Sequence, residues 1–180
     1  GPCTVVQRKS AQTDGYEAVQ LGFEEQKESR LTKPQQGHFK KAGAKPAKVL
    51  REVRLAKGDD AKAGDVLTAK VFEGVKFVDV LGQTKGRGFQ GVIKRFKLGG
   101  GRASHGGGWL RKPGSIGNRE WPGRIFKNKR LPGHMGSVDV TTQNLRVVKV
   151  LADDHALLLD GAVPGPVGGI VLVRKAIEKA

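Results

Sequence analysis

Charge and glycine divide this sequence into two kinds of chain. Residues 82–138 hold 13 lysines and arginines against a single acid, Glu120, together with 15 of the 27 glycines. The remaining residues carry a net charge of only +4 out of the total of +16. The apolar side chains of residues 82–138 are too few and too irregularly spaced to build a core. We therefore expect a folded body, residues 1–81 and 139–180, with residues 82–138 inserted in it as an extended basic loop.

The whole-chain composition excludes several classes of protein. A length of 180 residues suits one compact domain, or a small domain with an extension. With Cys3 as the single cysteine, neither an intrachain disulfide nor a cysteine-based zinc site can form, which favours a reducing, intracellular compartment. No run approaches the roughly 18 apolar residues of a membrane span, and a pI near 10.3 indicates a polyanionic partner instead. Because the chain begins without methionine, we expect it to be processed, trimmed or cut from a longer one.

Short apolar runs outside the basic stretch predict a mainly β protein with one or two short helices. The turn-like residues 73–74 lie between two of these runs and predict a hairpin. Short helices are expected at residues 34–42 and 90–97. Seven or eight strands of this kind are typical of a small closed barrel or of a sandwich. The expected strands are residues 4–8, 16–23, 49–55, 66–72, 75–81, 138–151, 156–160 and 170–174.

A glycine pattern at residues 86–91 matches G-x-G-x-x-G, the dinucleotide-binding fingerprint. That fingerprint needs a following helix and an acid about 20 residues further on. Here a second glycine-rich run, residues 99–108, follows, and no acid lies between Asp79 and Glu120. We interpret these glycines as backbone that must approach phosphates closely, not as a nucleotide site, and we expect no cofactor.

No pattern in the sequence indicates catalysis. The four histidines lie far apart without clustered acids, so a metal site is not expected. The Ser104–His105 pair has no orienting acid nearby in the sequence, so a hydrolase triad is not indicated. We predict that the protein is not an enzyme and takes no small-molecule substrate.

Three aromatic residues, Trp109, Trp121 and Phe126, lie among glycines and arginines. Aromatic rings interleaved with arginine suit stacking on unpaired bases or packing in an RNA groove. A small cluster of the three rings that pins the loop onto itself is an equally good interpretation. The sequence leaves both open.

Several blocks, taken in order along the chain, resemble the family of bacterial large-subunit ribosomal protein three. Their consistent spacing over essentially the whole chain is far more specific than any one block. The matching blocks are residues 14–22, 33–43, 86–96, 104–106, 113–117, 122–124, 129–136 and 161–165.

The resemblance implies a six-stranded β-barrel body with a long, irregular extension that penetrates the large ribosomal subunit. It implies direct binding to 23S ribosomal RNA, an early role in subunit assembly, and an extension tip near the peptidyl transferase centre. Large-subunit proteins fourteen and nineteen are the implied protein neighbours. The implied location is on ribosomes in the bacterial cytoplasm, with an organelle left open.

We predict the RNA contacts from the charged residues and from selected aromatic and histidine residues of the basic stretch. A basic architectural or single-strand-binding protein acting outside the ribosome is the alternative that the composition leaves open. The predicted contacts are Lys85, Arg87, Lys94, Arg95, Lys97, Arg102, His105, Trp109, Arg111, Lys112, Arg119, Trp121, Arg124, Lys127, Lys129, Arg130 and His134.

The sequence departs from the family pattern in three places. The usual start, with its first barrel strand, is missing before Gly1, and residues 99–108 replace an asparagine-rich entry to the loop. Glu120–Trp121 stands where relatives carry glutamine or a basic residue followed by threonine. We predict that the Glu120 carboxylate pairs with Arg119, with Arg124 or with a base amino group.

Overall fold

The computed structural model describes residues 1–55 and 61–179, and these residues form a mainly β structure. They divide into two compact units, which we treat separately. The first unit comprises Gly1–Val78, Leu145–Gly161 and Ile177–Ala180, and the second comprises Asp79–Asn144 and Ala162–Ala176. No helix in the described part of the chain is long and apolar enough to cross a membrane.

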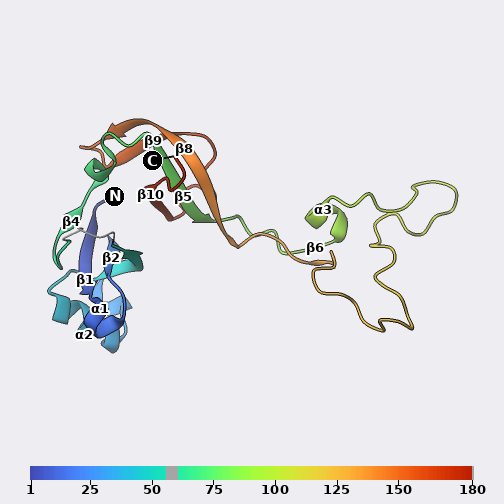
Figure 1. The fold of residues 1–180 in the computed structure, drawn as a ribbon, viewed down its shortest axis with the longest axis horizontal. Coiled ribbons are helices and arrows are strands. Elements are labelled where there is room, and N and C mark those ends of the chain that lie inside the picture. The colour runs from blue at the N-terminus through green and yellow to red at the C-terminus, as the bar shows by residue number, and fades with distance from the viewer. Residues whose placement is uncertain (56–60, 180) are drawn as a thin grey trace. The chain divides into compact units, whose positions relative to one another are not determined.

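The first unit contains an antiparallel sheet with the strand order β3–β2–β1–β4 (Figure 1). The connection between β1 and β2 is a single helical turn, α1 (Ala11–Asp14). A bulge between Val5 and Gln7 shifts the register of the β1–β2 ladder. The strands are β1 (Cys3–Lys9), β2 (Ala18–Glu25), β3 (Ala47–Arg54) and β4 (Val66–Leu67).

Helix α2 (Lys33–Ala42) packs on this unit through Phe39, which is 2% exposed. The helix begins after Thr32, whose backbone N–H donates to Gln35 Oε1 at 3.0 Å, and Pro34 occupies its first turn. It ends at Gly43, which adopts the left-handed conformation with a φ of 63°. These start and stop signals explain why the predicted helix at residues 34–42 is confirmed almost to the residue.

The expected strand at residues 66–72 is wrong over most of its length. Only β4 is extended, and it pairs with β1, while Ala69–Phe72 forms a 3-10 helix, η2. The predicted hairpin is also wrong: the N–H groups of Glu73 and Val75 donate to the carbonyls of Lys70 and Phe72, which closes the helical turn. Among the described residues, β4 pairs only with β1, and the turn of η2 separates it from the strand that follows.

A second sheet has the strand order β10–β5–β8–β9. Strands β8 and β9 form an antiparallel hairpin whose register shifts between Val147 and Lys149. The strands are β5 (Phe77–Gln83), β8 (Asp139–Leu151), β9 (Ala156–Asp160) and β10 (Val171–Lys175).

Asp79 is a buried acid on β5, within the second unit, and is only 1% exposed. Its Oδ1 accepts a hydrogen bond from the backbone N–H of Asn144 at 3.0 Å, and its Oδ2 lies 3.6 Å from Arg174 Nε. Asn144 has a left-handed φ of 57°. Asp79 thus ties β5, β8 and β10 together close to the points where the chain leaves for residues 82–138 and returns from them.

The strand pairing of the described residues yields the two four-stranded sheets and a two-stranded ribbon, and no closed barrel is found among them. The predicted mainly β class with a few short helices is confirmed. Closure would require the outer strands of the sheets to pair, and no such ladder is present in the described part of the chain.

Candidate nucleic-acid interface

The basic stretch lies within the second unit and begins as a two-chain stalk. Outgoing and returning segments run antiparallel, with Thr84 N–H donating to the Val138 carbonyl at 3.0 Å and Arg87 N–H donating to Met135 at 2.8 Å. The ladder ends in β6 (Phe89–Gln90) paired with β7 (Gly133–His134) (Figure 1). The stalk therefore ties both ends of the predicted extension together through its own backbone.

Glycine is required at one position of this stalk. Gly136 has a φ of 76°, and a Cβ there would collide with the Lys85 carbonyl oxygen. Any other residue would strain the backbone and open the ladder. Part of the glycine content of the basic stretch therefore serves the close approach of its own two chains.

Helix α3 (Val92–Phe96) follows the stalk and is held by contacts to the returning chain. Val92 is buried, and Arg95 Nη1 donates to the Leu131 carbonyl at 2.8 Å. The Arg95 guanidinium lies 4.9 Å from the centre of the Phe96 ring, and that of Arg130 lies 6.0 Å from it. The predicted helix at residues 90–97 is confirmed, and Arg95 joins the outgoing chain to the returning one.

A closed loop follows α3. Gly101 and Lys112 both donate backbone N–H groups to the Trp109 carbonyl, at 3.2 and 3.1 Å. The ammonium of Lys112 lies 5.4 Å from the Trp109 ring centre. His105 turns the chain in the left-handed conformation with a φ of 61° and takes part in no metal-binding cluster in the described chain. The loop presents Trp109 beside a cation.

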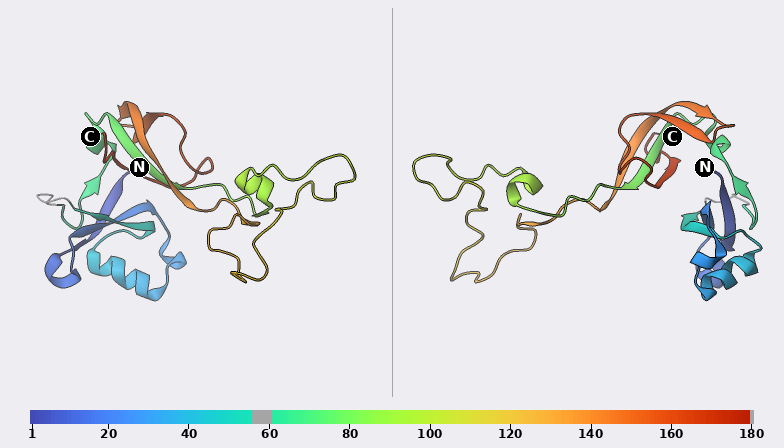
Figure 2. Two further views of the ribbon diagram at one scale, coloured as in Figure 1. Left: turned by 45° about the vertical axis from the view of Figure 1, so that its right-hand side comes forward. Right: turned by 180° about the vertical axis from the view of Figure 1, so that it is seen from behind.

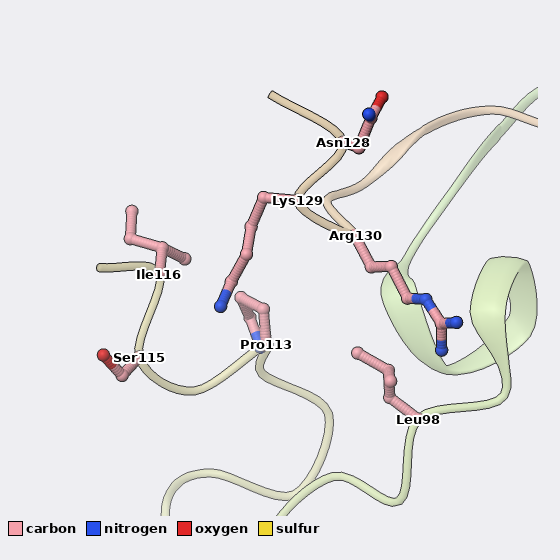
Figure 3. Close-up of a pocket in the computed structure, with 7 residues that line it drawn as sticks. All are labelled: Leu98, Pro113, Ser115, Ile116, Asn128, Lys129 and Arg130. Carbon is pink, nitrogen blue, oxygen red and sulfur yellow. The ribbon is translucent and has the colours of Figure 1, made fainter. Parts of the chain in front are cut away.

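A shallow hollow of about 260 Å³ lies between the outgoing and returning parts of the basic stretch. Figure 3 shows Lys129 extending into this hollow and Arg130 turned toward α3. Residues from both the outgoing and returning chains take part. The lining residues are Leu98, Pro113, Ser115, Ile116, Asn128, Lys129 and Arg130.

The three singled-out aromatic rings are exposed and separate. Trp121 is 83% exposed, and Trp109 and Phe126 are each 58% exposed. Arg124 lies 5.6 Å from the Phe126 ring centre, and no ring contact joins any two of the three within the described residues. The described residues therefore contain no aromatic cluster that pins the loop, and the three rings stay largely exposed beside cations.

The charges of residues 82–138 are not neutralised within the described chain. No salt bridge forms in this stretch, whereas Lys9, Lys45 and Lys48 of the first unit each pair with a glutamate. Glu120 is exposed and meets neither Arg119 nor Arg124 in the part of the chain that the structure describes, so this predicted pairing is not found. Arg124, one of the two arginines predicted as partners, lies 5.6 Å from the Phe126 ring centre instead.

Residues 43–157 match the family Ribosomal protein L3. The chain is 50% identical over 179 residues to the large ribosomal subunit protein uL3 of Deinococcus radiodurans, which covers 99% of this chain and 83% of the relative. It is 49% identical over 178 residues to the uL3 protein of Geobacter sulfurreducens, with coverages of 99% and 85%. The chain belongs to the ribosomal protein L3 family.

Membership in the L3 family confirms the resemblance drawn from the sequence blocks. A ribosomal protein family is a structural class, so the expectation that the protein is not an enzyme is confirmed as well. The predicted RNA contacts stay a prediction. Most of them lie on exposed parts of the stalk, loop and returning chain, while Arg95 and Arg130 also make contacts within the protein.

Sequence reasoning missed Phe89 as a candidate contact. Its ring is 68% exposed and meets the His134 ring edge-on, with 5.8 Å between the ring centres. The signal was present, since Phe89, like the other candidate rings, is an aromatic residue in a basic stretch, and it is flanked by Gly88 and Gln90. The Phe89–His134 pair adds an aromatic surface at the end of the stalk.

Proposed function

We propose that the protein is a structural constituent of the large ribosomal subunit and binds 23S ribosomal RNA directly through residues 82–138. This proposal is supported by the membership of the chain in the L3 family. It is also supported by the composition of that stretch, which holds 13 cations and exposed aromatic rings and forms no internal salt bridge among the described residues. Such a surface lacks its counter-charges, and RNA phosphates supply them.

Counterion release is the physical basis of this binding. Each lysine or arginine that neutralises a phosphate releases condensed counterions, so affinity falls steeply with salt. The exposed faces of Trp109, Trp121 and Phe126 are suited to stacking on unpaired bases, which cations beside them reinforce. Recognition by shape and stacking then outweighs sequence readout.

The finer parts of the proposal rest on the family resemblance. They are an early role in subunit assembly, an extension tip near the peptidyl transferase centre, and contacts with large-subunit proteins fourteen and nineteen. They also include a ribosome-bound location in the bacterial cytoplasm.

The proposed architecture is a six-stranded barrel body, residues 1–81 and 139–180, with residues 82–138 inserted as the RNA-penetrating loop. A closed barrel leaves no sheet edge free. Amide hydrogen exchange on the intact protein would test this. Closure predicts that the backbone amides along the outer edges of β3 and β9 are protected from exchange. Rapid exchange along both edges would contradict the barrel.

Sedimentation with ribosomes tests the main proposal. The tagged full chain, expressed in a bacterium, is expected to sediment with large subunits and to remain there after a high-salt wash. A basic protein that acts outside the ribosome would be released into the free fraction by that wash. Recovery of the protein only in the free fraction would overturn the proposal.

A further inference from the structure

Helix α2 of the first unit presents a lysine face away from its buried side. Lys33, Gly37, Lys40 and Lys41 follow the spacing i, i+4, i+7 and i+8, which places them on one side of the helix. Phe39 lies on the other side and is buried. All three lysines are exposed, and Figure 2 shows α2 at the surface of the first unit.

The lysines of this face have no acid partner in the described chain, although neighbouring lysines do. Lys45 Nζ, just before β3, lies 2.8 Å from Glu25 Oε1, and Lys48 Nζ lies 3.0 Å from Glu24 Oε2 across the β2–β3 ladder. No such pair is formed by Lys33, Lys40 or Lys41. The lysines on strands β1 and β3, Lys9 and Lys48, are thus paired with glutamates, whereas those of α2 are not.

A second basic segment lies beside α2. The side-chain amide of Gln36 donates to the Glu28 carbonyl at 3.0 Å and to the Leu31 carbonyl at 3.3 Å. These bonds hold the 3-10 helix η1 (Glu28–Arg30) against α2. Lys27 and Arg30 of that segment are exposed and have no acid partner among the described residues, so the unpaired charge extends beyond the helix.

No contact within the protein explains why residue 37, in the middle of the lysine face, is glycine. It has ordinary helical backbone, and a Cβ built on it would meet nothing within 4 Å. Glycine inside a helix is less stable than alanine there, because it gains the most freedom on unfolding. Neither crowding nor a special backbone angle within the chain requires glycine at this position.

We propose that the face formed by Lys33, Gly37, Lys40 and Lys41 is a second RNA-binding surface, separate from residues 82–138. The three lysines neutralise phosphates of one RNA backbone segment, and Gly37 lets that backbone approach the helix without the obstruction of a Cβ. A phosphate backbone explains both the unpaired cations and the missing side chain. This inference rests on the proposed function, because it assigns a further site to the same RNA partner.

A pair of charge-matched variants tests the lysines. Lys33→Gln/Lys40→Gln and the control Lys45→Gln/Lys48→Gln lower the net charge equally, and the control residues are exposed in the same unit. Binding of the full chain to purified bacterial 23S rRNA is measured as a function of salt. The helix variant is expected to flatten the logarithmic salt slope by about 1.4–1.8, at roughly 0.7–0.9 per lost phosphate contact, and the control is expected to leave it unchanged. Equal slopes for the two variants would overturn the proposal.

Gly37→Ala provides a test in which stability and binding move in opposite directions. The variant is expected to raise the melting temperature of the free protein, because alanine favours the helix. It is expected to weaken rRNA binding several-fold, because the added methyl group keeps the phosphates away. Unchanged or tighter binding, or a lower melting temperature, would contradict the role assigned to Gly37.

The same measurements separate this inference from the proposed function. Failure of the unmodified chain to bind rRNA above background would overturn both. Binding by the unmodified chain that Lys94→Gln/Lys129→Gln weakens and Lys33→Gln/Lys40→Gln leaves intact would overturn only the second surface.

Discussion

Cations and aromatic rings have opposite environments in the first unit and in the basic stretch of residues 82–138. In the sheet, Lys48 of β3 pairs with Glu24 of the neighbouring strand β2, and Phe39 of the helix packed on this unit is buried. In residues 82–138, cations have no acid partner in the described chain and large rings lie exposed. A region stabilised by its own contacts is complete without a partner. A region that leaves charges and rings unsatisfied is built for contacts that another molecule supplies.

The largest expected difference between the two regions concerns their aromatic rings. Phe39→Ala should lower the free energy of unfolding by about 3–5 kcal/mol, because it empties a buried site in the first unit. Trp121→Ala should change that free energy by less than about 0.5 kcal/mol, because its ring is already exposed. Denaturant unfolding of both variants measures this comparison.

The affinity for rRNA should depend more on Trp121 than on Phe39, the reverse of their order in stability. Trp121→Ala is expected to weaken rRNA binding by about 1–3 kcal/mol if its ring stacks on a base. Phe39→Ala should bind with nearly unchanged affinity under conditions in which it stays folded. A Trp121 variant that loses stability and keeps its affinity would show that the ring belongs to the protein interior and not to the RNA interface.

Lysines of the basic stretch should contribute more to rRNA binding than lysines near the C-terminus. Lys94→Gln/Lys129→Gln avoids Arg95 and Arg130, which make contacts within the protein, and should flatten the salt slope of rRNA binding by about 1.4–1.8. Lys175→Gln/Lys179→Gln removes the same net charge and should have much less effect. Equal changes in slope would mean that total charge, and not its location, determines binding.

Much of this division could be predicted from the sequence, because it depends on composition and local signals. Alternating apolar residues predicted β1, β2 and β9, and the Thr32–Gln35 and Gly43 caps delimit α2. Residues 66–72 were mispredicted because pairing with β1, a long-range contact, decides which part of an apolar run becomes a strand.

Side-chain partners in the basic stretch were harder to predict. No periodicity places Arg124 over Phe126 instead of beside Glu120, since both acid and ring lie within a few residues of it. The path of the loop depends on left-handed residues such as His105 and Asn128, which a pattern of apolar residues does not encode. Charge density therefore predicted the role of the stretch far better than its internal contacts.

The third comparison concerns pH. Hydrogen bonds from Lys9 and then Tyr16 lower the pKa of Glu52, and the bond to Glu52 raises the pKa of Lys9. The stabilisation from Glu52 is present above its unfolded pKa of about 4.3 and is lost as the pH falls through its lowered folded pKa. The stabilisation from Lys9 is present below its unfolded pKa of about 10.4 and is lost as the pH rises through its raised folded pKa.

Glu52→Gln should therefore lower the melting temperature by a constant amount between about pH 5 and 10, and by less as the pH falls below that window. The effect is small, since Glu52 is 38% exposed and water screens the pair. Arg124→Gln in the extension should show no such pH dependence, because it has no carboxylate partner among the described residues. A Glu52 variant with the same melting temperature deficit at pH 3 as at pH 7 would contradict the ion-pair origin.

The smallest expected effect is at Glu120, the single acid of residues 82–138. In the free protein, Glu120→Gln should leave the free energy of unfolding within about 0.5 kcal/mol of the original, because the carboxylate is exposed and has no partner among the described residues. Two opposite effects are possible on RNA: repulsion from phosphates, which glutamine removes, and acceptance of a hydrogen bond from a base amino group, which glutamine retains through its carbonyl oxygen. Comparison with Glu120→Ala separates them, because alanine removes both charge and acceptor. We predict that the Gln variant binds rRNA within about threefold of the original and that the Ala variant binds more weakly than the Gln variant, by the roughly 0.5–1.5 kcal/mol of a single hydrogen bond. If both variants bind more tightly and equally so, Glu120 acts only through repulsion, and the extension tolerates its acid instead of using it.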